Sequence, residues 1–185
     1  ASHAGGSPEK GINSIKSAAL AITNIKSGRI DEETTCNIGV INGGQETNIV
    51  PEITEVKTEA RSLNVNKLNN VTDEIVYQFK KASDISGTKL EYEIIREYEG
   101  YEISPDDSAV KIAENALKKL GITCKLKPTG GGSDANNFNS RGKHAVNLSC
   151  GIENCHSNEE YIKIEELGKL IKLIIEICRY DKEEI

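Results

Sequence analysis

The sequence has no methionine, no tryptophan and only two phenylalanines among its 185 residues. Because even position 1 is not methionine, we expect a processed or excised piece of a longer protein. No apolar run reaches the roughly 20 residues that a membrane-spanning helix needs, since lysines and a glutamate interrupt KLIKLIIEIC. The N-terminus also lacks the basic and then apolar pattern of a signal peptide. We therefore expect a cytoplasmic protein with no membrane partner.

Positive charge is scarce as well. The chain has 23 lysines and arginines against 29 aspartates and glutamates, which gives a formal net charge of -6 at pH 7. Such a chain is not attracted to the phosphate backbone of a nucleic acid. We therefore expect no nucleic-acid partner, but a small molecule or another protein. Apolar residues make up 37% of the chain, enough for the core of one large domain or two small ones.

The cysteines lack the paired spacing of a zinc knuckle or a disulfide framework. There are five of them, Cys36, Cys124, Cys150, Cys155 and Cys178. We interpret them as reduced thiols. Cys150 and Cys155 lie near His156 as soft metal ligands would, but C-x4-C-H lacks a fourth partner at a usual structural-zinc spacing, so a zinc site there is only a minor alternative.

The first hundred residues alternate between helix and strand patterns. Apolar residues at helical spacing predict helices over residues 8–27 and 65–83. Strands are predicted in TTCNIGVINGG, with Cys36, Ile38 and Val40 on one face, in EITEVKTEARSL and in TKLEYEIIREYEGYEIS. The order helix, strand, strand, helix, strand indicates a ferredoxin-like unit whose first strand is missing or reduced to ASHAGG.

From Ser104 the pattern changes to helices alternating with short strands. SPDD begins one predicted helix, SDANNFNS begins a second, and apolar positions from Leu167 to Cys178 mark a third. ITCKLKP and HAVNLS are predicted strands. This order is typical of α/β proteins, but two strands are few for an independent sheet. We predict a ferredoxin-like α+β domain over residues 1–102 and part of a larger α/β domain over residues 103–185.

The chain has three histidines, His3, His144 and His156. His156 lies in a glutamate-rich loop, where either a solvated histidine or a metal ligand fits. His3 lies in a glycine-rich segment that suits presentation of an imidazole in a cleft, although alone it would be a terminal residue. His144 opens a predicted strand, and we interpret it as a core or surface imidazole.

A glycine-rich loop and an arginine are further candidates for binding. PTGGGSDANNF places Gly131 and Gly132 between a predicted strand and a helix, with Ser133 or Asp134 as the N-cap. Such a loop lets a ligand approach the backbone and offers N–H groups to a negative group, but a tight structural turn explains it equally well. It is not a nucleotide-binding motif. Arg61 on its predicted strand can clamp a carboxylate or remain a solvated surface residue.

Taken together, separated blocks of the sequence resemble the peptidase T-like branch of the aminoacylase and carboxypeptidase G superfamily of zinc peptidases. The blocks are SHAGGSPEKGINSI, GGQETNIVPE, EARSL and TGGGSDANNFNSRGKHAVNLSCGIENCHSNEEYI. The resemblance implies a zinc-bearing α/β catalytic domain that is interrupted by a ferredoxin-like lid, which often dimerises. Residues 1–102 match the lid, and residues 103–185 match the return into the catalytic domain.

The resemblance also implies roles for individual residues. His156 matches the family's last metal ligand, at one of two zinc ions that share a bridging water. His3 matches the lid histidine that stabilises the tetrahedral oxyanion, often in the partner subunit's site. The matching substrate-binding positions are Asn48, Arg61, Gly131, Gly132 and Ser133. The first two hold the substrate backbone or its terminal carboxylate, and the loop residues line the substrate pocket.

One part of the family pattern has no counterpart in this sequence. The family's earlier His-x-Asp pair, its bridging aspartate and its Glu-Glu pair are missing, because His3 is the only upstream histidine and the acidic run at 31–33 falls in a lid loop. We therefore expect a fragment of a dizinc, tripeptide aminopeptidase-like enzyme of short peptides. Its parent would hold two zinc ions per active site and form a homodimer through the lid, whereas this chain alone would bind zinc weakly and be inactive. The alternatives are an amidohydrolase or deacylase of N-acyl amino acids, and a noncatalytic dimerisation module.

Overall fold

The computed structural model describes residues 1–180, which form two compact units. The first unit comprises residues 1–95, and the second unit begins at Arg96. The domain boundary that we placed after residue 102 stays a prediction, because compactness alone does not show which segments fold independently. Residues 181–185 of the predicted second domain lie outside the described residues.

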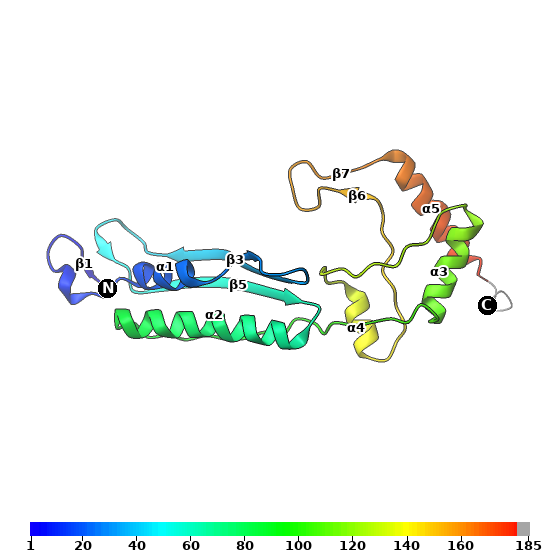
Figure 1. Ribbon diagram of the computed structural model, residues 1–185. Helices are drawn as coiled ribbons and strands as arrows, with labels where there is room; N and C mark the ends of the chain where they lie inside the picture. Colours follow the sequence, from blue (N-terminus) through cyan, green and yellow to red (C-terminus); the bar gives the residue numbers. More distant parts are fainter. Residues whose placement is uncertain (181–185) are drawn as a thin grey trace. The chain divides into compact units, whose positions relative to one another are not determined.

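An antiparallel sheet of three strands forms the centre of the first unit (Figure 1). Its strands, in spatial order, are β2 (Gly28–Arg29), β3 (Thr34–Gly43) and β5 (Thr54–Ser62). The two long strands confirm the strands predicted from the alternation. On β5, Val56 and Thr58 are half-buried, whereas Lys57 between them is exposed.

A β-bulge at Gly39 changes which side chains of β3 are buried. The register with β5 shifts between Ile38 and Val40, so the side chains beyond the bulge alternate in the opposite phase. Cys36 is 2% exposed, whereas Val40 is 41% exposed. The prediction of one shared face is therefore correct for Cys36 and Ile38 and wrong for Val40.

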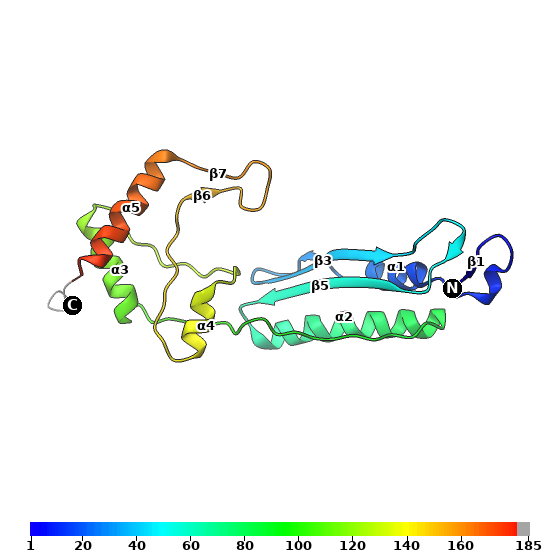
Figure 2. The ribbon, with the colours of Figure 1, turned by 180° about the vertical axis from the view of Figure 1, so that it is seen from behind.

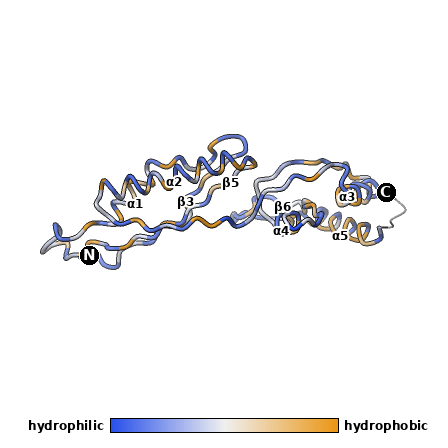
Figure 3. The backbone as a smooth tube through the Cα atoms, turned by 90° about the horizontal axis from the view of Figure 1, so that it is seen from below, coloured by the Kyte–Doolittle hydropathy of each residue, from blue (hydrophilic) through white to orange (hydrophobic). Residues whose placement is uncertain are grey.

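Two helices lie on the same side of this sheet (Figure 3). They are α1 (Ser14–Asn24) and α2 (Val65–Ser86), which contact each other and both long strands. Ile25, Cys36 and Ile75 are buried together between the helices and the sheet. This is the core of the first unit, and it forms because each element turns its apolar residues to the same interior.

The predicted helix boundaries need one correction. The helix expected over residues 8–27 is divided, because Asn13 accepts a hydrogen bond from Lys16 N at 3.0 Å and begins α1. Pro8–Lys10 form a separate 3-10 turn, η1. The helix predicted over 65–83 is confirmed as α2, which ends at Gly87 in the left-handed region with φ of 69°.

A short two-stranded ladder completes the first unit. It pairs β1 (Ser2–His3) with β4 (Ile49–Val50) in antiparallel register. The segment ASHAGG therefore does contribute a strand, as one of the two predicted possibilities. However, this strand pairs with β4 and not with the three-stranded sheet.

No strand forms over residues 88–104, although their alternation predicted a long one. The segment after Gly87 runs back along α2 (Figure 2), since Nζ of Lys80 in α2 lies 5.2 Å from the centre of the Tyr92 ring. At the start of this segment, Thr88 Oγ1 lies 2.9 Å from Ser17 Oγ of α1. A strand requires a neighbour with which to exchange backbone hydrogen bonds. Within residues 1–180 no strand adjoins this segment. The mixed α and β character is confirmed, but within residues 1–180 the last strand of the predicted ferredoxin-like order does not form.

The second unit is mainly helical. It contains α3 (Ser108–Lys119), α4 (Asp134–Ser140) and α5 (Ile164–Cys178), which confirm the three predicted helices. The strands predicted in ITCKLKP and HAVNLS do not form, for the same lack of a partner, and only the two-residue strands β6 (Ile152–Glu153) and β7 (Tyr161–Ile162) pair. Helix α3 packs against α5, where Val110 and Leu173 are buried. Among residues 1–180, no helix is both long and apolar enough to cross a bilayer.

Candidate functional site

His3 lies at the start of a turn that holds its imidazole in place. The backbone N–H groups of Gly5 and Gly6 both donate to His3 Nδ1, at 3.1 and 3.0 Å. Ser7 N donates to the His3 carbonyl at 3.0 Å. His3 is therefore a fixed residue whose side chain is exposed, and not a loose terminal one.

The β1–β4 ladder places Asn48 beside His3. His3 is paired with Ile49, and Ala4 N donates to the Asn48 carbonyl at 2.8 Å. Both His3 and Asn48 are exposed. Two polar residues that are 45 positions apart in the sequence thus lie on adjacent strands at one end of the first unit.

Strand β5 runs away from β1 (Figure 1), and Arg61 is the last but one residue of this strand. It is seven positions after Thr54 on β5, and seven residues of strand span about 23 Å. Arg61 Nη2 contacts Glu59 Oε2 at 2.9 Å. Within one copy of the chain, the structure brings His3 and Asn48 together but does not bring Arg61 to them.

The acidic run at residues 31–33 forms ion pairs with a lysine. Lys67 Nζ lies 3.1 Å from Asp31 Oδ2 and 2.6 Å from Glu33 Oε1. The backbone N–H of Glu33 and then the lysine lower the pKa of Asp31 from 3.8 to about 2. Because this pKa is depressed in the fold, the stability that it contributes is present above pH 3.8 and is lost as the pH falls toward about 2.

His156 lies in the turn between β6 and β7, with its backbone in the left-handed region. Its φ is 65°, which is uncommon and unfavourable for a residue other than glycine. His156 N donates to Glu160 Oε2 at 2.7 Å, and Ser157 N donates to the Asn154 carbonyl at 3.1 Å. The turn therefore holds an exposed imidazole on a strained backbone, which motivates a functional hypothesis.

The residues around His156 do not fit a two-zinc centre by themselves. Among residues 1–180, no three or more His, Cys, Asp or Glu side chains are placed to share one metal ion. Cys150 and Cys155 therefore do not complete a ligand set with His156. A zinc site usually has three or four protein ligands, so residues 1–180 supply at most a part of one.

The glycine-rich loop before α4 is a well-capped turn. Ser133 Oγ accepts from Ala135 N at 3.2 Å, and Asn136 Oδ1 accepts from Ser133 N at 3.0 Å, which together form a capping box. Asn147 Nδ2 also donates to Ser133 Oγ at 2.8 Å. Of the two predicted caps, Ser133 is the N-cap. The predicted role of this loop in lining a substrate pocket stays a prediction.

Gly132 is packed against Tyr98 and has no room for a side chain. A Cβ at Gly132 would lie 2.3 to 2.5 Å from the Tyr98 ring, whereas a Cβ at Gly131 would meet Thr129 Oγ1 at 3.5 Å, an ordinary contact. We expect Gly132→Ala to displace Tyr98 and to lower the free energy of unfolding by about 1–3 kcal/mol. Gly131→Ala should change it by less than about 0.5 kcal/mol. Denaturant unfolding followed by circular dichroism measures both.

The tyrosine itself provides the control for this clash. If the Tyr98 ring is the obstacle, Gly132→Ala should cost less when it is combined with Tyr98→Ala than it costs alone. Equal losses in Gly131→Ala and Gly132→Ala would contradict the close packing at Gly132.

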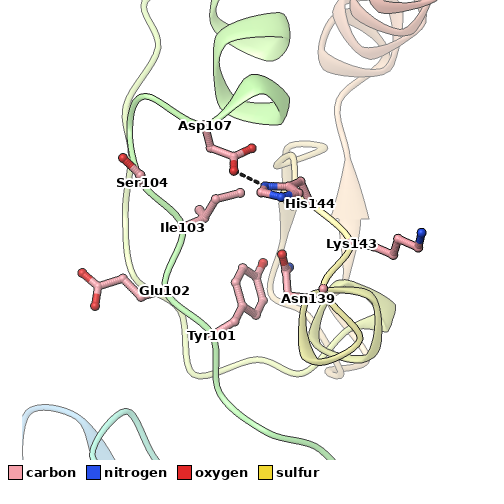
Figure 4. A pocket seen from close by; sticks show the side chains of 9 residues that line it. Tyr101, Glu102, Ile103, Ser104, Asp107, Asn139, Lys143 and His144 are labelled. Carbon is pink, nitrogen blue, oxygen red and sulfur yellow. Dashed lines mark hydrogen bonds and ion pairs between the residues drawn. The ribbon is translucent and has the colours of Figure 1, made fainter.

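A pocket of about 320 Å³ in the second unit contains an Asp–His pair that the sequence analysis missed (Figure 4). Asp107 is the N-cap of α3, where its Oδ1 accepts from Ala109 N at 2.9 Å, and its Oδ2 contacts His144 Nδ1. The hydrogen bond from His144 and then that from Ala109 lower the pKa of Asp107. The SPDD motif indicated the helix start, but no spacing in the sequence links positions 107 and 144. Because the pair ties the start of α3 to the segment after α4, we interpret it as structural.

Comparison with known proteins identifies the class of the first unit. Residues 1–85 match the family described as the peptidase dimerisation domain. This range contains the β1–β4 ladder, the three-stranded sheet, α1 and nearly all of α2. The first unit therefore contains a peptidase dimerisation domain.

Individual relatives extend the match to most of the chain. The chain is 41% identical over 175 residues to the uncharacterized protein YqjE of Bacillus subtilis (strain 168), covering 95% of this chain and 47% of that protein. It also resembles two solved structures, each over 95% of this chain and 47% of theirs. These are aminopeptidase PepT from Bacillus cereus ATCC 10987, with a TM-score of 0.75 and 39% identity, and a tripeptidase from Staphylococcus aureus subsp. aureus mu50, with 0.81 and 34%. The chain thus contains an M20 peptidase dimerisation domain and is peptidase T-like over most of its length, as the sequence predicted, and it spans about half the length of these relatives.

Proposed function

We propose that this chain is the dimerisation lid and a C-terminal catalytic segment of a peptidase that hydrolyses short peptides. The observation that carries the proposal is the pair of exposed residues His3 and Asn48, which the β1–β4 ladder joins on a domain of the dimerising class. The likeness to an aminopeptidase and a tripeptidase at 39% and 34% identity supports the reaction and the size of the substrate.

The surface of α5 supports a missing catalytic half. Its apolar residues Ile164, Leu167, Ile171 and Ile174 are 43% to 83% exposed. An apolar stripe of this spacing normally packs against another element. Because the relatives are about twice as long, we propose that a further part of the catalytic domain covers this face and brings other ligands to His156. The whole protein, meaning this chain together with that part, would be the active form.

The proposed roles of the lid residues follow from their position. His3 donates a hydrogen bond to the negatively charged oxygen of the tetrahedral intermediate, where it stabilises charge that exists only in the transition state. Asn48, its neighbour across the ladder, holds the substrate backbone. In a homodimer formed through the first unit, both can reach the partner's active site. Arg61 lies at the other end of the sheet. We propose that it holds the substrate carboxylate in one active site of the dimer, while His3 and Asn48 of the same copy serve the other.

A substrate panel tests this function. We expect the whole protein to cleave tripeptides and to leave N-acyl amino acids intact. Release of the acyl group with no peptide cleavage would replace the proposal by a deacylase or amidohydrolase. Dimer formation without hydrolysis of either substrate class would favour the noncatalytic dimerisation module.

A further inference from the structure

The hydrogen bonds to the His3 ring determine which of its nitrogens carries the proton. Both donors, Gly5 N at 3.1 Å and Gly6 N at 3.0 Å, are backbone amides. A backbone amide nitrogen can only donate, so His3 Nδ1 must be the acceptor. A neutral imidazole that accepts at Nδ1 carries its proton on Nε2.

We propose that Gly5 and Gly6 are positioning residues whose backbone N–H groups hold His3 as an Nε2–H donor. The catalytic meaning of this inference rests on the proposed function. A developing oxyanion needs a hydrogen-bond donor, and Nε2–H supplies one at the exposed edge of the ring. In the other tautomer the same edge would present a lone pair, which repels negative charge. The two amides therefore decide whether His3 attracts or repels the transition state.

The surrounding contacts show that the amides act on the ring and not merely on the turn. The backbone next to His3 is already fixed, because Ser7 N donates to the His3 carbonyl and Ala4 N donates to Asn48 O. Within the described part of the chain, the hydrogen bonds of the ring itself are those from Gly5 and Gly6. Removing them would free the tautomer while leaving the ladder paired.

The glycines are needed for their N–H groups and not for space. A Cβ at Gly5 would lie 3.6 Å from His3 Cε1, and a Cβ at Gly6 would lie 3.5 Å from His3 Nδ1, both ordinary contacts. Neither glycine has a positive φ. Alanine thus keeps the donor, whereas proline removes it. Gly5 is the cleaner position, because Gly6 N also approaches the His3 carbonyl at 3.3 Å.

Nitrogen NMR of the unaltered 185-residue chain, labelled with ¹⁵N-histidine, measures the tautomer directly. We expect His3 to show an unprotonated Nδ1 and a protonated Nε2 at a pH where the ring is neutral, with the signal assigned by His3→Gln. His144 is an internal control of the opposite kind, because its Nδ1 contacts the Asp107 carboxylate and must carry the proton. A His3 signal of the Nδ1–H form, or an average of both forms, would overturn the proposal whatever the activity.

Matched variants then link the tautomer to catalysis. Gly5→Pro removes one of the two donors, so it should raise the share of the Nδ1–H tautomer and lower kcat of the whole protein in proportion to the share of Nε2–H that remains. Gly5→Ala should keep the Nε2–H signal and be far less impaired. Likewise His3→Gln, which keeps an N–H near the Nε2 position, should retain more activity than His3→Asn, which does not.

Failure of the positioning role of Gly5 and Gly6 and failure of the proposed peptidase function give different experimental results. If the NMR result is as expected but Gly5→Pro is as active as Gly5→Ala, the positioning role is overturned. If the unaltered whole protein hydrolyses no peptide, the proposed function fails, and the ¹⁵N signals of His3 still decide whether the amides fix the tautomer.

Discussion

Replacing His156 with alanine in the whole protein should reduce kcat/KM for a tripeptide by more than about 100-fold. Residues that only orient a metal ligand cost up to about 100-fold when they are replaced, and loss of a ligand itself should cost at least as much. The reason is that we propose His156 as a metal ligand held by the β6–β7 turn. Steady-state kinetics and the zinc content of the purified variant measure the effect. Wild-type activity in the variant would contradict the ligand role.

A second substitution, His156→Gly, should abolish activity without lowering the free energy of unfolding. This result would distinguish the loss of a metal ligand from the loss of the fold. His156 has a φ of 65°, a conformation that glycine adopts without strain. We therefore expect His156→Gly to be inactive while its free energy of unfolding stays equal or rises by up to about 1 kcal/mol. His144→Ala is the matched control in the same unit. It should remain active and should raise the pKa of Asp107 by removing its hydrogen-bond partner.

Combining two inactive variants should restore activity. We expect His3→Ala alone to lose about 100- to 1,000-fold in kcat, as for other single oxyanion donors. If His3 serves the partner's site, a heterodimer of His3→Ala and His156→Ala contains one complete site, made of His156 from one copy and His3 from the other. Its activity should then be about half that of the wild-type dimer, which has two such sites. Purification with two different tags isolates the heterodimer for this measurement.

The control for this experiment uses the double variant. A heterodimer of His3→Ala with a chain that carries both substitutions has no His3, so it should stay inactive. Failure of the first heterodimer to recover activity would show that His3 acts within its own copy or not at all.

Local patterns in the sequence predicted the helices better than the strands. The helices depend on neighbouring residues, such as the apolar stripe of α2 and the cap at Ser133, and both α2 and α4 form where expected. A strand depends on a partner that is distant in sequence. Residues 88–104, 122–128 and 144–149 have the composition of strands, but within the described residues none of them has a strand to pair with. The bulge at Gly39 was also invisible, because Ile38 and Val40 alternate regularly in the sequence but are paired to β5 in different phases.

The contacts of the candidate site likewise join residues that are distant in the sequence, so local patterns could not predict them. The family blocks pointed to His3 and Asn48, but only the β1–β4 ladder shows that the two residues are neighbours. The contact of His144 with Asp107 joins positions that no motif connects. The acceptor role of His3 Nδ1 depends on how the turn over Gly5 and Gly6 is folded, which the run of small residues does not reveal.

The most direct test of the account compares zinc content and peptide cleavage in the isolated 185-residue chain and in the whole protein. Because tight binding of zinc needs three or four ligands, and the account assigns one to this chain, the isolated chain should hold much less than one equivalent of zinc after gel filtration and cleave no tripeptide. The whole protein should hold about two zinc ions per site and be active. Stoichiometric zinc together with tripeptide cleavage by the isolated chain would contradict the account.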